Sequence, residues 1–122
     1  MNSETAMPLD WNHGALADGL RCYQDGEFFL AHEHWECAWL RAAEPDKTFL
    51  QSLIQIAAAM HHFERGNRTG AASLLARSLR RLEAFPSRYG GVELDPLRRS
   101  LRAWLLALDA QQSPHPPFPP IR

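Results

Sequence analysis

The sequence predicts an all-α fold: a compact bundle of about five helices with a central apolar helix, the third, and an extended proline-rich C-terminal tail. Apolar side chains recur at helical spacing in five segments, and loops containing glycine or proline separate these segments. No two segments alternate polar and apolar residues as paired strands do. The 122 residues can build one hydrophobic core but not two. We therefore expect one helical domain, residues 1–111, followed by a tail, residues 112–122.

Two helices are predicted before the central one. Residues 12–24 carry Leu16 and Leu20 at helical spacing, and Gly26 ends this segment. Residues 27–41 form the second helix, which holds an unusual density of histidine, glutamate and tryptophan. The short loop between them makes the two helices neighbours.

The third helix, residues 46–65, is expected at the centre of the bundle. It begins at Asp46, directly after a proline, and apolar side chains cover most of its circumference. A helix that is apolar over so wide an arc is usually buried on most sides. One narrow stripe along it differs, and it consists of Gln51, Gln55, Ala58 and His62.

The fourth helix is predicted over residues 68–85. Gly66 and Asn67 precede it as a helix stop and a new N-cap. Pro86 and the pair Gly90–Gly91 are interpreted as its end.

The fifth helix begins at Asp95 and Pro96, because a cap followed by proline is a favoured start. Its apolar face consists of Leu97, Leu101, Trp104, Leu105 and Leu108. The tail that follows, "SPHPPFPPIR", cannot be a helix, because proline lacks the backbone donor and fixes an extended geometry. We expect it to be a loose end or an arm across its own domain or a neighbouring subunit.

Nothing in the sequence directs the chain to a membrane or out of the cell. No apolar run reaches the roughly 18 residues that a membrane helix needs. The first ten residues do not resemble a secretory signal. Cys22 and Cys37 lie far apart outside any CxxC arrangement, which argues against a disulfide framework or a cysteine zinc site. We expect a cytoplasmic protein with no membrane association.

The second predicted helix carries the first half of a candidate site. On a helical wheel, His32 and Glu36 lie one turn apart on the stripe that also carries Trp35 and Trp39. An ionisable pair that faces a core is costly unless another group satisfies it. A partner side chain, a water molecule or a ligand must therefore complete this pair.

The third predicted helix can complete the site, because Gln51, Gln55 and His62 share its polar stripe. If this stripe faces the second helix, these groups meet His32 and Glu36 in a polar pocket walled by the two tryptophans. Three interpretations stay open. The groups form a structural hydrogen-bonded network, a pocket for a small molecule, or a metal site completed by a histidine of the third helix.

Familiar catalytic and metal-binding motifs do not appear. His32, Glu33 and Glu36 give HExxE, whereas zinc peptidases carry HExxH. Neither helix has the Glu-x-x-His spacing of di-iron bundles, and the chain has no GxSxG, P-loop or GxGxxG segment. We assign no metal ligands and no cofactor, and we leave open whether a metal is bound and whether the protein is an enzyme. An acid–base role for Glu36 with His32 is the remaining catalytic option.

Charge is distributed unevenly along the chain. Residues 1–64 hold ten acidic and three basic side chains, whereas residues 65–122 hold four acidic and ten basic ones. Such a split can favour association between copies. The net charge of −1 and the lack of a recognised module argue against nucleic acid as the partner. If the fourth and fifth helices are adjacent, six arginines form one outward basic patch: Arg77, Arg80, Arg81, Arg98, Arg99 and Arg102.

Two stretches resemble a known bacterial and archaeal family. The run "AHEHWECAWL" (residues 31–40) and the run "FLQSLIQIAAAMHHFERGNRTGAASLL" (residues 49–75) are similar to domain-of-unknown-function family 309. The similarity covers roughly residues 20–95, with Ser52 where family members often have glycine. The resemblance implies a compact all-helical fold and a standalone cytoplasmic protein, and it brings no activity, substrate or cofactor.

We therefore predict that the protein binds a small molecule or an ion between the second and third helices. The expected binding residues are His32, Trp35, Glu36, Trp39, Gln51, Gln55 and His62. The alternative is a non-catalytic protein-interaction or homo-oligomeric module, in which the same polar network is structural.

Overall fold

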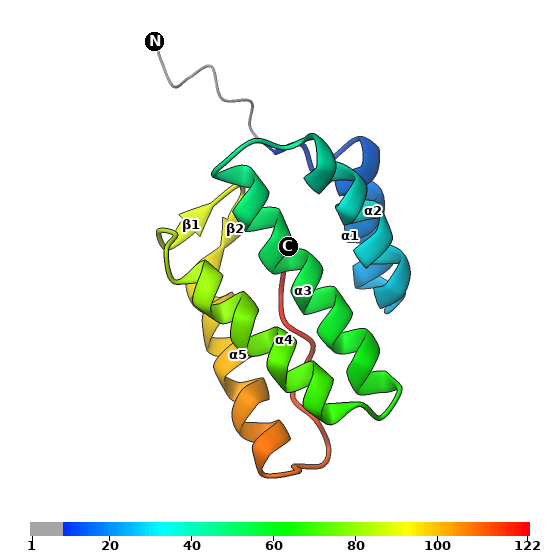
Figure 1. The fold of residues 1–122 in the computed structure, drawn as a ribbon, viewed down its shortest axis with the longest axis vertical. Coiled ribbons are helices and arrows are strands. Elements are labelled where there is room, and N and C mark those ends of the chain that lie inside the picture. The colour runs from blue at the N-terminus through cyan, green and yellow to red at the C-terminus, as the bar shows by residue number, and fades with distance from the viewer. Residues whose placement is uncertain (1–8) are drawn as a thin grey trace.

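The computed structural model describes residues 9–122, and within this range it confirms a compact all-α fold (Figure 1). Its elements are α1 (Gly14–Gln24), α2 (Phe28–Arg41), α3 (Asp46–Glu64), α4 (Arg68–Leu82), β1 (Arg88–Tyr89), β2 (Val92–Glu93) and α5 (Leu94–Asp109). In the described range, no helix is both long and apolar enough to cross a membrane.

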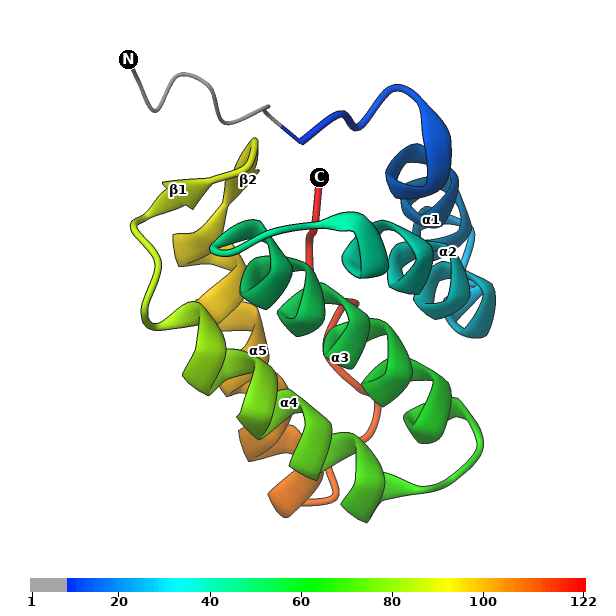
Figure 2. The same ribbon diagram turned by 45° about the horizontal axis from the view of Figure 1, so that its top comes forward.

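Helix α3 occupies the centre of the molecule, as predicted. It packs against both α2 and α4, while α1 packs on α2 and α5 packs on α4. Figures 1 and 2 show α1 and α2 on one side of α3 and α4 and α5 on the other. Phe49, Leu53, Ile56 and Met60 have no exposed surface, because α3 is covered from several directions. Nine of its 19 residues are buried, and the others are half-buried or exposed.

Helix α4 begins where the sequence predicts. The Asn67 side chain accepts a hydrogen bond from the Gly70 backbone nitrogen at 2.9 Å, which caps the helix. Gly66 has a φ of +82°, a conformation that glycine adopts without a steric cost. The helix ends at Leu82, three residues before the predicted end.

A small antiparallel hairpin follows α4, so the prediction of a chain without paired strands was wrong here. Arg88 pairs with Glu93, and Tyr89 pairs with Val92. The connecting Gly90 and Gly91 have φ values of +58° and +80°, the positive values that a tight two-residue hairpin turn requires. Two-residue strands are too short to show an alternating pattern, and only the glycine pair indicated the turn.

Arg98 was predicted to belong to an outward basic patch, but it is a structural residue. Its side chain is only 12% exposed and lies beside Asp95, with the two groups 2.9 Å apart. Its Nη1 atom donates to the backbone oxygens of Leu82, at 2.7 Å, and Phe85, at 3.0 Å. Arg98 therefore satisfies carbonyl groups that the end of α4 leaves without helical partners.

The proline-rich tail is an arm across its own domain. Trp104 Nε1 donates to the oxygen of Pro117 at 2.8 Å, and the Tyr23 hydroxyl donates to the oxygen of Pro119 at 2.7 Å. Burial raises the pKa of Tyr23, which keeps this hydroxyl protonated as a donor. Ile121 is only 2% exposed. Figures 1 and 2 show the tail passing behind α3.

Replacing Gly19 with alanine is expected to destabilise the protein by about 1–3 kcal/mol. A Cβ atom at this position would lie 2.3 Å from ring atoms of Trp35, in the contact between α1 and α2. Alanine normally favours a helix over glycine by about 1 kcal/mol, so the expected sign reverses the helix propensity. Chemical denaturation measures the change in the free energy of unfolding. A variant as stable as the parent would contradict this tight contact.

Candidate functional site

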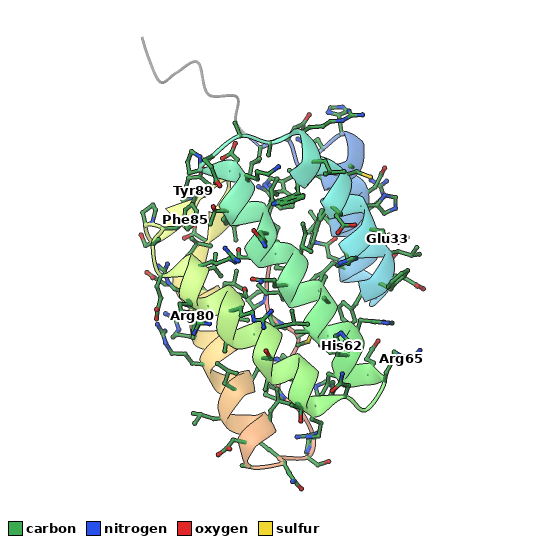
Figure 3. All side chains as sticks on the ribbon, in the orientation of Figure 1. Glu33, His62, Arg65, Arg80, Phe85 and Tyr89 are labelled. Atoms are coloured by element: carbon green, nitrogen blue, oxygen red, sulfur yellow. The ribbon has the colours of Figure 1, made fainter. Side chains whose placement is uncertain are left out.

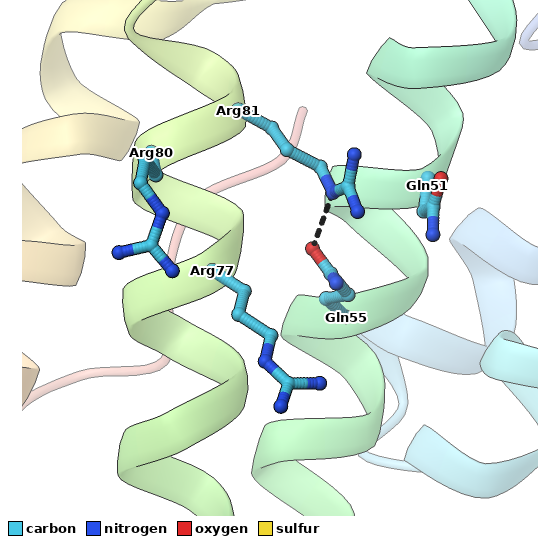
Figure 4. Close-up of a pocket in the computed structure, with 5 residues that line it drawn as sticks. All are labelled: Gln51, Gln55, Arg77, Arg80 and Arg81. Carbon is cyan, nitrogen blue, oxygen red and sulfur yellow. Dashed lines mark hydrogen bonds between the residues drawn. The ribbon is translucent and has the colours of Figure 1, made fainter.

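A polar groove of about 540 Å³ lies between α3 and α4 (Figure 4). Its lining residues are Gln51 and Gln55 of α3 and Arg77, Arg80 and Arg81 of α4, and we call it the arginine groove. Its volume lies within the range of small-molecule sites, which is roughly 300–1,000 Å³.

Helical periodicity places these five side chains on facing surfaces. Gln51 and Gln55 are one turn apart on α3, and the three arginines follow the i, i+3, i+4 pattern on α4. Beneath this polar surface, α3 and α4 contact each other through Ser52 and Ser78. The buried Ser78 hydroxyl donates to the backbone oxygen of Ser52 at 3.0 Å, which fixes α4 against α3. The groove is therefore built on two helices that a buried contact holds together.

One hydrogen bond links the two walls of the groove. Arg81 Nε donates to Oε1 of Gln55 at 3.3 Å, and Gln55 is only 8% exposed. Figure 4 shows Arg77 and Arg81 extending from α4 toward α3, whereas Arg80 lies along the outer side of α4. Because Gln55 engages the Nε atom, both terminal nitrogens of Arg81 stay available to a ligand.

The groove is strongly positive. Among the ion pairs between described residues, none includes Arg77, Arg80 or Arg81. The carboxylate of Glu44 lies near enough to be influenced by Arg81, but hydrogen bonds from Thr48 are the main cause that lowers the pKa of Glu44. Three guanidinium groups therefore border the groove without an ion-paired carboxylate, and an anion entering it would reduce their mutual repulsion.

The predicted site residues do not gather at one place. Trp35 has no exposed surface, and its Nε1 donates to the backbone oxygen of Leu16 at 3.1 Å. Its ring stacks on Tyr23 at 5.7 Å and meets the edge of Trp11 at 6.5 Å, measured between ring centroids. Trp35 is therefore a core residue between α1 and α2 rather than the wall of a pocket.

The other polar residues of α2 lie outside the arginine groove. Glu36 is exposed, and the half-buried ring of His32 stacks beside Phe29 with the centroids 6.1 Å apart. The Nδ1 atom of His32 is buried without a hydrogen-bond partner among the described residues. The ring of the half-buried Trp39 lies 4.0 Å below the ammonium group of Lys47, which also donates to the Trp39 backbone oxygen at 2.9 Å.

His62 lies near the turn between α3 and α4. Its Nδ1 atom is 3.1 Å from Nδ2 of Asn67, the residue that caps α4. Figure 3 shows His62 near the C-terminal end of α3, away from Arg80. Within residues 9–122, no three histidine, cysteine, aspartate or glutamate side chains are placed to hold a metal ion together.

The structure thus unites two predicted site residues, Gln51 and Gln55, with three arginines that the sequence placed on a separate surface patch. The two glutamines recur at helical spacing on α3, and the three arginines do so on α4, so each set lies on one face of its helix. Either stripe is readable from the sequence, but periodicity does not tell which neighbouring helix a stripe faces.

Two comparisons with known proteins found similar sequences. Residues 16–74 match the model of a family described as "Domain of unknown function (DUF309)". The chain is also 30% identical over 87 residues to an "Uncharacterized protein" of Aquifex aeolicus (strain VF5). That match covers 70% of this chain and 26% of the Aquifex protein. The chain therefore spans about a quarter of this relative.

Proposed function

We propose a function from the geometry of the chain itself, because residues 16–74 match a family model whose description, "Domain of unknown function (DUF309)", states no activity. The protein binds a small anionic molecule in the arginine groove. This proposal keeps the small-molecule class expected from the sequence and moves the site from the α2–α3 contact to the α3–α4 contact.

The observation that carries the proposal is the unpaired positive charge beside two amides. Arg77, Arg80 and Arg81 take part in none of the ion pairs between described residues. Guanidinium groups present paired N–H donors that match the oxygens of carboxylates and phosphates. The amides of Gln51 and Gln55 add both donors and acceptors at the same place.

The lining supports binding rather than a reaction. It holds arginine and glutamine side chains only. Neither residue type supplies a nucleophile or a group that exchanges protons near neutral pH. The groove can hold and orient an anion, which is the role of a binding or carrier protein.

Calorimetric titration with inorganic phosphate and with citrate at low ionic strength tests this function. We expect binding of at least one of these anions that weakens as salt is added, because exposed charges are screened. In a double variant, glutamine replaces both Arg77 and Arg81. We expect this variant to bind the anion about 100-fold more weakly or worse, since hydrogen bonds to charged groups contribute about 1.5–3 kcal/mol each.

Arg65→Gln is the matched control for this experiment. Arg65 is exposed at the end of α3 (Figure 3), and the change removes a like charge. The separation of ten positions between Gln55 and Arg65 corresponds to about 15 Å along a helix. Equal binding by the parent and the double variant would contradict the proposal, and so would an equal loss in the Arg65 control.

A further inference from the structure

We infer that the anion held by the arginine groove is a phosphate monoester on a small hydroxylated carbon skeleton, such as a sugar phosphate. This inference rests on the proposed function and narrows it to one chemical class of ligand.

The first argument is charge. Arg77 and Arg81 are the two guanidinium groups that extend toward α3 (Figure 4). A phosphate monoester carries a charge of about −1.5 to −2 near neutral pH, which matches this pair. A monocarboxylate would neutralise only one of the two. Arg80, on the outer side of α4, then adds attraction without being required for the contact.

The second argument is shape. Arg77 and Arg81 lie one helical turn apart, so their N–H donors reach a ligand from two levels, that is, from two positions along the axis of α4. A phosphoryl group offers three peripheral oxygens in a tetrahedral arrangement and can accept from both levels at once. A single carboxylate offers two oxygens in one plane, which suits one guanidinium.

Gln55 acts here as a positioning residue. It accepts from Nε of Arg81 and is nearly buried, so it holds the guanidinium plane in one orientation before a ligand arrives. Pre-organisation of this kind reduces the entropy lost on binding.

The third argument concerns the rest of the ligand. A groove of about 540 Å³ holds far more than one phosphate group, so a carbon skeleton fits beside it. No aromatic side chain lines the groove, and a nucleobase would therefore find no ring on which to stack. Gln51 offers an amide with donors and an acceptor, the pairing that hydroxyl groups need.

Titration of the full chain with five probes tests this class: glucose 6-phosphate, glucose, inorganic phosphate, citrate and AMP. We expect glucose 6-phosphate to bind about tenfold more tightly than inorganic phosphate, since one or two additional hydrogen bonds contribute about 1 kcal/mol each. AMP is expected to bind no more tightly than inorganic phosphate, and glucose is expected not to bind.

Single variants separate the two parts of the ligand. Gln51→Leu is expected to abolish the advantage of glucose 6-phosphate over inorganic phosphate while leaving phosphate affinity unchanged. Arg81→Gln is expected to weaken both ligands about tenfold or more. Arg80→Gln is expected to have a smaller effect than Arg81→Gln, because of its outer position.

The outcomes distinguish this inference from the proposed function. Binding of phosphate or citrate that depends on Arg77 and Arg81, without a preference for glucose 6-phosphate, would overturn the ligand class and leave anion binding in place. Tighter binding of AMP or of citrate than of glucose 6-phosphate would also overturn the class. No binding of any anion would overturn both.

Discussion

Trp35→Ala is expected to destabilise the protein by about 3–5 kcal/mol, the cost typical of removing a large buried aromatic side chain. Trp35 has no exposed surface, and it contacts Trp11, Tyr23 and Gly19. Truncation would open a cavity between α1 and α2 and would also remove the hydrogen bond from Trp35 Nε1 to the backbone oxygen of Leu16. Native domains are stable by only about 5–15 kcal/mol, so this change would remove a large share of the total.

Chemical denaturation followed by circular dichroism measures this loss, and Trp39→Ala is the internal control. Trp39 is half-buried at the surface of α2, and its main charged contact is Lys47. We expect its replacement to cost less than half as much, because exposed cation–π contacts contribute about 0.5–1 kcal/mol. Equal losses for the two tryptophans would contradict the assignment of Trp35 to the core and Trp39 to the surface.

Ile121→Ala, near the last residue of the chain, is expected to cost about 2–4 kcal/mol, as for an isoleucine in a core. Only 2% of Ile121 is exposed, although its neighbours Pro120 and Arg122 are exposed. Its burial depends on the docked tail, which is held by Trp104 at Pro117 and by Tyr23 at Pro119. Loss of the side chain would weaken this packing as well as the contacts of Ile121 itself.

Pro120→Ala provides the matched comparison, because Pro120 is the exposed neighbour of Ile121. Its replacement is expected to change the free energy of unfolding by no more than about 1 kcal/mol, as for most exposed sites. Thermal unfolding of both variants would show whether position 121 alone contributes to the core. A negligible shift for Ile121→Ala would mean that the tail is not docked in solution.

The helices could be predicted because their signals are local. The apolar circumference of α3 predicted its central place, and Asn67 predicted the cap of α4. The role of Arg98 could not be predicted, because its carbonyl partners lie 13 and 16 residues away in the preceding helix and loop. The burial of Ile121 likewise depends on contacts with the distant parts of the chain where the tail docks.

The candidate site was predictable only in part for a related reason. A helical wheel places Gln51 and Gln55 on one stripe of α3, but it does not identify the neighbouring helix that this stripe faces. In the structure these residues line the groove with Arg77 and Arg81 of α4. Trp35 was grouped with His32 and Glu36 because they share an arc of α2, yet Trp35 is in the core and Glu36 is exposed.

The tail contacts join residues that are far apart in the chain. The hydrogen bond from Tyr23 to Pro119 spans 96 residues, and the one from Gln24 to Arg122 spans 98. Helical bundles usually reach the native state quickly because most of their contacts are local, and distant contacts slow this process. The bundle can thus assemble before the tail closes over it, and a weakened tail would mainly accelerate unfolding while leaving the folding rate nearly unchanged.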